Sequence, residues 1–588
     1  MFLFRLVVFL FLLNICSTAM SDTVTVSADK NQSSDTSVQQ NIDTNDVTLT
    51  VSGNAQVDDD NKAVLVDSGV EGASVIVKSG STVTTTSGDN GVLGLNTTSL
   101  SIINSGTISA NSMKAIDIYR STDASITNNS GAEISSVGNT IRTGGTSGDN
   151  SSGYTITNSG KIFSTSTGVK SSVFFSNTNS SGGTITNNSG AEIYSGGDIA
   201  TIRVGGTTTI KNSGSIKNNG SVDDNVIELL GNNNTVTLEE GSTLVGKISS
   251  ASGTSGNTLK LNLGAGQGYF YETVGDFTLE DLDGNQVVKG SAGSVGQGGS
   301  ETLDELLSYK SINLRNFFSK FNKLDDKETW GETYTSNLKR DSHTSNLALE
   351  YDLINFGVNL INRIENANFV IAFEGGRQDF TKGHKIDYHN ISAGVYLPQK
   401  NNPYLNLDLF ILGGITLKEG ERTILTNTTT SGKLKVNSDY ETYEIHTGIK
   451  RNNLSLIPDL GLTASYSMTP NYDETKYFSW EGRHIGNLSI LFSDNYNLIK
   501  NKDSKLFLGW TLDMRNMIGD KKQVYSINGS SATYKQHNDL TNEISLLANM
   551  GYEKKFSEKS NISFSLEAKD TKRYVKSFGA NISLSSKF

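Results

Sequence analysis

Cysteine, histidine, tryptophan and proline are all absent from residues 22–300 of this 588-residue chain. Catalysis by serine–histidine–aspartate or cysteine–histidine sets needs a histidine base, so both are excluded from this segment. Zinc sites with histidine or cysteine ligands are excluded there as well. The whole chain holds one cysteine, Cys16, which cannot form an intramolecular disulfide. The first half must therefore be stabilised without the disulfide bonds that are common in small secreted domains.

The first residues have the pattern of a secretory signal peptide. Arg5 supplies a positive charge, residues 6–13 an apolar core, and residues 17–19 a small-residue cleavage site. The apolar run is too short to span a bilayer. Cleavage after residue 19 or residue 21 fits equally well. Cys16 offers the alternative of a lipoprotein site, but the bulky Ile15 stands where such sites have a small residue.

Composition changes near residue 300. All three tryptophans, all four prolines and all six histidines follow that point. Residues 22–300 carry 27 acidic and 14 basic residues, whereas the rest of the chain is close to neutral. We therefore expect two domains in different surroundings, joined by the Gly- and Ser-rich stretch 291–300.

The first half repeats a short polar unit. The nonapeptide ITNNSGAEI occurs at Ile126 and again at Ile185, and looser copies lie before, between and after these two. The turn glycines step by 24 to 30 residues, which is the range of solenoid periods. They are Gly80, Gly106, Gly131, Gly160, Gly190, Gly214 and Gly241.

Each unit is expected to be a strand, an Asn-Ser-Gly turn and a second strand. Gly would supply the positive φ angle, and Asn or Ser would bond back to its own backbone. Isoleucines on either side of the turn can be buried only when units stack. The sequence thus predicts a parallel β-helix, with inserts such as the one from Arg142 as loops on its flank. A disordered low-complexity stalk is the alternative.

The second half, from about Thr329, contains twelve candidate strands in which apolar and polar residues alternate. From Tyr443 to Lys450, for example, Ile445 and Ile449 oppose Glu444, His446 and Lys450. A membrane barrel needs one apolar face and one wet face, although a soluble sandwich would show the same alternation.

The connections favour the barrel. Short polar turns follow strands two, four, six, eight and ten, whereas most other connections are longer, notably those from Leu417 and Asn516. This asymmetry is typical of periplasmic turns and extracellular loops.

Residues 301–326 lack Gly and Pro and predict a helix. One apolar face holds Leu303, Leu307, Leu314, Phe318 and Phe321, interrupted by Lys310. About 20 helical residues span roughly 30 Å, the thickness of the hydrocarbon core of a bilayer. The helix could therefore run through the barrel; a packing helix on the barrel rim is the alternative.

Signal peptide, β-helical repeats, helix and barrel, in that order, resemble the autotransporters, the type V secretion proteins of Gram-negative bacteria. The region from Asn234 looks like the C-terminal folding segment of their passengers, and TWGETY at Thr329 is similar to their first barrel strand. Phe588 matches their terminal aromatic residue, with Ile582 and Leu584 leading up to it. Ser586 departs from the pattern. The helix also has no Asn-Asn pair, since Asn313, Asn316 and Asn322 each stand alone.

The expected fold class is all-β. The expected domains are a signal peptide at 1–21, a β-helix passenger at 22–300, a pore or linker helix at 301–326 and a twelve-stranded antiparallel transmembrane barrel at 327–588. The resemblance implies outer-membrane lipid, the barrel-assembly machinery and periplasmic chaperones as partners. It also implies an exported passenger at the cell surface, where an extracellular or host ligand could bind. We expect no cofactor, no metal and no nucleic-acid partner, and a monomeric barrel.

Three functions compete. The favoured one is an adhesin-like or shielding surface display with no catalytic, cofactor-binding or metal-binding residues. A carboxylate-based polysaccharide enzyme on the same scaffold is the second, and a porin-like barrel with a periplasmic β-helix is the third. Carboxylate catalysis would need paired acids, for which the candidates are Asp58-Asp59-Asp60, Asp223-Asp224 and Glu239-Glu240. GGTSGDN at Gly144 faintly resembles a calcium-binding repeat but occurs once. In the barrel, His389 and His446 are expected to lie mid-strand as hydrogen-bonded fillers.

Overall fold

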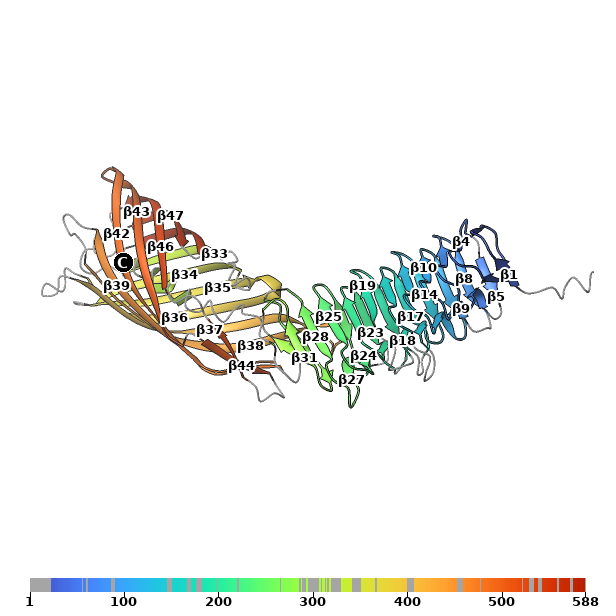
Figure 1. Ribbon diagram of the computed structural model, residues 1–588. Coiled ribbons are helices and arrows are strands. Elements are labelled where there is room, and N and C mark those ends of the chain that lie inside the picture. The colour runs from blue at the N-terminus through green and yellow to red at the C-terminus, as the bar shows by residue number, and fades with distance from the viewer. Residues whose placement is uncertain are drawn as a thin grey trace, which may run out of the picture.

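The computed structural model shows a rod of stacked coils attached to one end of a barrel (Figure 1). It describes residues 23–586 except for 55, 60–61, 86–89, 145–150, 167–170, 176–181, 198, 219–220, 265, 285–286, 288–291, 295–305, 308, 312, 315–316, 319–328, 341–349, 365–366, 399–406, 452–457, 476, 521, 528–532, 538–541, 558–559 and 572–574. The predicted signal peptide, the candidate acid Asp60 and the terminal Phe588 lie outside the described residues. Among those described, no helix is both long enough and apolar enough to cross a bilayer.

The rod is a parallel β-solenoid with three sheets, which confirms the predicted β-helix and rules out the disordered stalk. Sheet A holds β1(Thr23–Val26), β3(Gln39–Ile42), β6(Lys62–Val66), β9(Asn90–Leu95), β12(Lys114–Tyr119), β15(Ile141–Thr143), β18(Val173–Phe175), β21(Ile202–Val204), β24(Asn225–Leu229), β27(Lys247–Ser250) and β30(Thr273–Val274). Sheet B holds β2(Lys30–Gln32), β4(Thr48–Val51), β7(Ser74–Val77), β10(Ser101–Asn104), β13(Ser125–Asn128), β16(Thr155–Asn158), β19(Gly183–Asn187), β22(Thr208–Asn212), β25(Thr235–Glu239), β28(Thr258–Asn262) and β31(Thr278–Asp281). Sheet C holds β5(Gln56–Asp59), β8(Thr82–Thr85), β11(Thr107–Ala110), β14(Glu133–Ser136), β17(Lys161–Ser164), β20(Glu192–Ser195), β23(Ser215–Asn218) and β26(Thr243–Val245).

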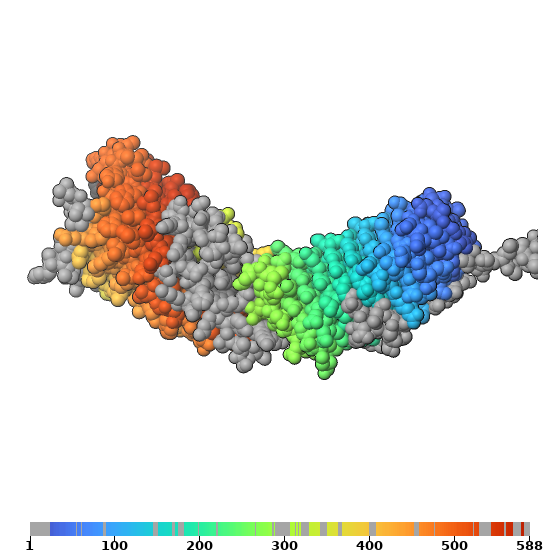
Figure 2. Space-filling model, viewed as in Figure 1, coloured from blue at the N-terminus to red at the C-terminus, as the bar shows by residue number. Residues whose placement is uncertain are grey.

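The repeated unit places like residues above one another. Ile126 of β13 pairs in register with Ile156 of β16, which pairs with Ile185 of β19, and all three side chains are buried. Each strand therefore contributes one or two apolar residues to a core that runs the length of the rod. The space-filling view shows the coils following one another without a break (Figure 2).

An asparagine ladder lies beside this apolar core. Asn104, Asn128, Asn158, Asn187 and Asn212 are 0% exposed, and each of the first four donates from Nδ2 to Oδ1 of the next, at 2.8–2.9 Å. In the short turns, the Asn Oδ1 also accepts from the glycine N–H two residues on, as at Asn158 and Gly160 (3.2 Å). The asparagine of the repeated unit recurs because each ladder residue bonds to an asparagine in the next coil.

The predicted role of the turn glycines is half right. Gly80, Gly131, Gly190 and Gly241 do have positive φ angles. Gly106, Gly160 and Gly214 do not; their turns are shorter, and the chain presses against the preceding coil. A Cβ on Gly160 would lie 2.2 Å from the carbonyl oxygen of Ala132. At these positions glycine is required by close approach of the backbone.

One predicted insert is partly core. The segment from Arg142 was expected to be a flanking loop, but Arg142 and Thr143 belong to β15. Arg142 binds the carboxylate of Asp117 on β12 through Nε (2.8 Å) and Nη2 (2.6 Å). Sheet A of the solenoid thus uses segments that do not carry the recognisable repeat.

The second half is a closed antiparallel barrel of twelve strands, as predicted. Its strands are β33(Thr329–Arg340), β34(Tyr351–Ile364), β35(Ala367–Phe380), β36(His384–Leu397), β37(Asp408–Thr426), β38(Lys433–Arg451), β39(Asp459–Thr469), β42(Arg483–Lys500), β43(Ser504–Gly519), β46(Asn542–Ser557), β47(Ser560–Thr571) and β48(Val575–Ser586). Closure comes from the pairing of β33 with β48. The predicted asymmetry of the connections holds only in part. Those after the third and eleventh strands are as short as the turn after the eighth, and the one after the fourth strand is as long as the one after the first.

Two predicted long loops contain strands. The segment from Leu417 is not a loop, because β37 and β38 continue through it as a hairpin of two 19-residue strands. The segment from Asn516 includes β44(Lys522–Ile527) and β45(Thr533–His537), which form a small sheet with β40(Tyr472–Glu474) and β41(Phe478–Trp480). β35 and β36 are joined by the short 3-10 turn η3(Thr381–Gly383). Two further strands, β29(Tyr269–Tyr271) and β32(Ala292–Ser294), lie where the rod meets the barrel.

Candidate functional site

A helix occupies the interior of the barrel. Helical residues fall at 306–307, 309–311, 313–314 and 317–318, and the remaining positions of the predicted helix 301–326 lie outside the described residues. All but Asn313, which is half-buried, are buried. Their partners lie on β33, β36, β37, β38 and β42, which only a position in the lumen can reach. The helix is therefore a lumen helix and not a packing helix on the rim.

The lumen helix runs from one end of the barrel to the other. Near its start, Leu306 packs with Leu338 and Phe380, which lie at the ends of β33 and β35. This is the end of the barrel whose connections hold the small sheet β40, β41, β44 and β45, and we call it the loop end. Near its end, Phe317 stacks on Trp330 with ring centroids 5.5 Å apart, at the beginning of β33 beside the short turns. The chain thus enters at the loop end, crosses the lumen and begins the first barrel strand at the turn end.

A buried ion pair lies at the middle of the helix. Nζ of Lys310 donates to both oxygens of Glu444 on β38 (2.9 and 3.1 Å) and to Oγ1 of Thr416 on β37 (3.0 Å). The Lys310 and Glu444 side chains are 7% and 2% exposed. A buried charge without its partner is costly, so the pair fixes the height and rotation of the helix in the lumen. The lysine that interrupts the apolar stripe is the residue that fastens the helix.

Ser311 and His446 extend this polar cluster. Oγ of Ser311 lies 2.9 Å from Nδ1 of His446, and Nε2 of His446 lies 3.3 Å from Oε2 of Glu444. The row has the residue types of a serine–histidine–acid set, yet Ser311 Oγ also donates to the carbonyl of Leu307 (3.1 Å) and Glu444 is bound to Lys310. Because these groups are engaged with the helix backbone and with Lys310, we interpret the row as an anchor for the helix.

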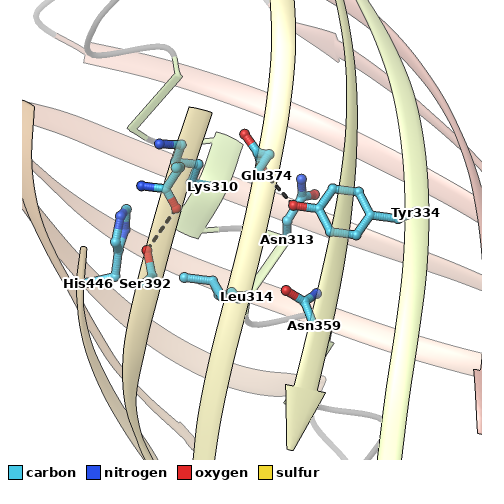
Figure 3. A pocket seen from close by; sticks show the side chains of 10 residues that line it. Lys310, Asn313, Leu314, Tyr334, Asn359, Glu374, Ser392 and His446 are labelled. Atoms are coloured by element: carbon cyan, nitrogen blue, oxygen red, sulfur yellow. Dashed lines mark hydrogen bonds between the residues drawn. The ribbon is translucent and has the colours of Figure 1, made fainter. Parts of the chain in front are cut away.

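A second carboxylate, Glu374, lies beside a small cavity that also faces Asn313. It accepts hydrogen bonds from the hydroxyls of Tyr334 (2.5 Å) and Tyr388 (2.8 Å). Figure 3 shows Glu374, Tyr334 and Asn313 directed toward one another from two strands and the helix.

The outer surface of the barrel is an apolar belt. Along β38, Ile445 is 50% exposed whereas the neighbouring Glu444 and His446 are buried, which is the inverse of a soluble core. Large apolar side chains are exposed on eleven of the twelve strands, among them Ile354, Phe356, Leu360, Phe369, Ile371, Phe373, Ile391, Ile411, Ile415, Ile445, Leu460, Leu462, Leu488, Ile490, Leu508, Met514, Ile544, Leu546, Met550, Phe564, Phe578 and Ile582. A belt of this kind is suited to lipid and not to water.

The two histidines singled out from the sequence have different surroundings. His446 faces the lumen, as expected of a hydrogen-bonded filler. The prediction that His389 is a lumen filler is wrong, because its side chain is exposed on the outer face of β36, two residues from Ile391. Asp387 on the same outer row binds Arg377, so the apolar belt ends between His389 and Ile391.

The acidic runs of the solenoid are not gathered into one site. Oδ1 of Asp59 accepts from the backbone N–H of Lys62 (2.9 Å), and Asp223 lies 3.7 Å from Lys247. Glu239 pairs with Lys211 (3.0 Å). These three contacts lie in different coils of the solenoid. Among the described residues, no group of acids or histidines could hold a metal ion.

Glu240 has a role that the sequence did not suggest. It binds Nζ of Lys382 in the short turn between β35 and β36 of the barrel. No local signal could have found this pair, because 142 residues separate the two partners.

No protein-family model matches the chain, and no curated protein matches it at a significant level. Solved structures similar to it include the translocator domain of the autotransporter NalP from Neisseria meningitidis, at 10% identity and a TM-score of 0.34, covering 49% of this chain and 100% of that one. The beta domain of the Bordetella autotransporter BrkA is similar at 10% identity and a TM-score of 0.30, covering 45% and 100%. The COG4313 outer membrane channel from Pseudomonas putida F1 is similar at 13% identity and a TM-score of 0.29, covering 45% and 97%.

Likenesses this distant add nothing to what the strands of the chain itself show. Those strands form a solenoid, followed by a lumen helix and a closed twelve-stranded barrel with an apolar belt. The chain therefore has the general arrangement of an autotransporter.

Proposed function

We propose that this chain is a self-exporting surface protein of a Gram-negative bacterium. Its barrel lies in the outer membrane and carries its own solenoid, the passenger, to the cell surface. The observation that carries the proposal is the path of the chain through the lumen. A passenger on one side of the membrane and a first barrel strand that starts on the other can be joined only through the barrel, and the lumen helix makes that connection.

The apolar belt supports the outer-membrane location, since charged residues stop where the belt begins. The partners that we propose are lipid around the belt and, during assembly, periplasmic chaperones and the barrel-assembly machinery. The barrel acts as a monomer, because its sheet closes on itself and its described lumen is filled by its own helix.

Protease treatment of intact cells tests this export. Fragments from residues 23–281 should be released, while the barrel strands stay protected in the membrane fraction. A passenger that becomes sensitive only after the outer membrane is permeabilised would contradict the proposal and would favour a periplasmic solenoid.

The role of the passenger is proposed to be adhesion or shielding and not catalysis. Its outward surface on sheet B is a continuous row of hydroxyl side chains, one from each of ten successive coils. The row consists of Thr48, Ser74, Ser101, Ser125, Thr155, Thr184, Thr209, Thr235, Thr258 and Thr278. Cells that display the chain should differ in surface attachment from cells that display the barrel alone. Equal attachment, together with glycan cleavage by the displayed passenger, would favour the carboxylate enzyme.

A further inference from the structure

The rod and the barrel share a sheet. Along the chain, the last coils run β25, β26, β27, β28 and β29, so β29 falls where the strand after β26 is expected in sheet C. Sheet C nevertheless ends at β26, and β29 pairs instead with β37 of the barrel. This pairing is parallel, with Tyr269 opposite Leu425 and Phe270 opposite Thr426.

The tip of the barrel hairpin β37–β38 lies between the two solenoid strands. On one side, the N–H of Gly246, which follows β26 directly, donates to the carbonyl of Asn427 (3.0 Å). On the other side, the N–H of Leu425 donates to the carbonyl of Gly268 just before β29 (3.0 Å). The end of β37 therefore occupies the place of a strand of sheet C.

Asn427 joins the two coils through its side chain as well. Oδ1 accepts from the N–H of Glu272 (2.8 Å), and Nδ2 donates to the carbonyl of the same residue (2.9 Å). Asn427 is buried, so both backbone groups of Glu272 would lose a partner if the amide were removed. Asn427 thus uses both polar atoms of its side-chain amide to bind a neighbouring coil, as the asparagines of the ladder do inside the rod.

An apolar cluster surrounds this inserted strand. Phe270 is the solenoid's contribution, and its ring packs against that of Tyr477 at a tilt of 43°, with ring centroids 4.6 Å apart. The other buried members all come from the barrel's connections and hairpin, namely Ile424, Val436, Phe478, Trp480, Tyr525 and Ile527. The small sheet β40, β41, β44 and β45 thus provides the pocket for Phe270.

We propose that the barrel hairpin is a structural strand of the passenger: the last coils of the solenoid close only on the barrel, which caps them and holds them without a covalent link. The exposed end of a solenoid needs a cap, because its strand edges and apolar core would otherwise face water. Here the cap comes from a segment more than 150 residues further along the chain. The inference goes beyond export, because it concerns how the folded passenger is completed and retained.

The test uses the purified full-length chain in detergent, with a site-specific protease sequence inserted after Ser294. An affinity tag in the β42–β43 turn captures the barrel after the chain is cut. We expect the cut passenger to remain with the unaltered barrel. Passenger that washes off as soon as the chain is cut overturns the proposal.

Substitutions locate the contact. Asn427→Ala and Phe270→Ala should each speed passenger release about tenfold or more, since each removes buried partners. Asn427→Asp keeps the acceptor for Glu272 and should fall between them and the unaltered chain. Lys435→Ala is the matched control, because this exposed lysine lies in the same hairpin and pairs with the exposed Glu421 of that hairpin. Equal release by Asn427→Ala, Phe270→Ala and Lys435→Ala contradicts the inference.

Two measurements keep the result interpretable. The heat-dependent gel mobility of the barrel shows that each variant barrel is folded. Thermal unfolding of the uncut chain shows whether the solenoid has lost its cap, and we expect a lower midpoint in Asn427→Ala even if the variant is never cut. A midpoint unchanged from Lys435→Ala also contradicts the inference. A failure of export in cells would leave these results in detergent unaffected.

Discussion

Asparagine holds the solenoid together at the scale of single residues. Each ladder amide donates to the amide above it and accepts from the one below, so the buried polar groups are satisfied only while the stack is complete. Asn158 also bonds the carbonyl of Glu192 and the N–H of Gly160. A polar residue can therefore occupy the core of the rod at every coil.

Replacement of one ladder residue should weaken the rod far more than its size suggests. Asn158→Ala leaves the buried amides of Asn128 and Asn187 short of a partner, and we expect a loss of at least about 1–3 kcal/mol. Asn129→Ala is the control, because that half-buried amide makes one bond to Ser105. Chemical denaturation followed by circular dichroism measures the difference. Equal losses in the two variants would contradict the role given to the ladder.

Tyr154 shows how one large side chain fits in this narrow core. Its ring passes over Gly183 in the next coil, and its hydroxyl lies 2.8 Å from Oγ1 of Thr208 in the coil after that. A Cβ on Gly183 would lie 1.9 Å from the ring.

The double change is therefore the informative one. Gly183→Ala should lower the unfolding temperature markedly through overpacking. Added to Tyr154→Ala, the same methyl group should cost much less, because the ring that it strikes is gone. Strictly additive effects in a double-mutant cycle would show that the two residues do not compete for the same space.

At the scale of elements, the sequence predicts the strands and the helix whose apolar residues recur with a regular spacing along the chain. The coils repeat, the barrel strands alternate, and the lumen helix has an apolar stripe, so periodicity alone finds them. The sequence predicts a long loop from Leu417, whereas β37 and β38 continue through this segment. Its partners are distant strands of the solenoid, and no local pattern encodes such a contact.

The candidate site shows the same division. Lys310 was visible as a break in the apolar stripe, but its partner Glu444 lies 134 residues away. His446 was placed in the lumen correctly, whereas His389 was not, because alternation gives the face of a strand only relative to its neighbours.

Loss of the central ion pair should loosen the lumen helix. Lys310→Ala leaves the buried carboxylate of Glu444 without its cation, a change that typically costs about 3–5 kcal/mol. We expect larger and noisier conductance in planar bilayers than the unaltered chain gives. Lys310→Ala combined with Glu444→Ala should recover part of the closure, since no unpaired charge remains. A single variant that stays as closed as the unaltered chain would remove the ion pair from the account.

The apolar belt predicts a sharp boundary on β36. Ile391→Arg puts a charge at the last apolar position of the belt on β36 and should lower barrel stability by up to about 1 kcal/mol, since the cost of a charge falls toward the interface. His389→Arg, two residues along the same outer row, should change it little. The folded fraction by heat-dependent gel mobility compares the two. Equal sensitivity at both positions would place the edge of the belt elsewhere.

At the scale of the whole molecule, the two halves distribute polar and apolar residues in opposite ways. The rod is polar outside and buries isoleucine and asparagine in stacks, whereas the barrel is apolar outside and buries its polar residues around the helix. The proposed export accounts for the order of the parts along the chain, because the polar rod would leave the membrane through the barrel. The proposed export therefore depends on the orientation of the barrel, that is, on which side of the membrane each of its ends faces.

The chain's single cysteine makes that question directly measurable. Cys16 lies in the predicted signal peptide, so a new cysteine should be the only thiol of the mature protein. Thr127→Cys places a thiol on the outer face of the rod, and Lys502→Cys places one in the exposed β42–β43 turn. A membrane-impermeant maleimide added to intact cells should label Thr127→Cys at once and Lys502→Cys only after the outer membrane is opened. The reverse pattern, or labelling of neither until the cells are opened, would contradict the central claim.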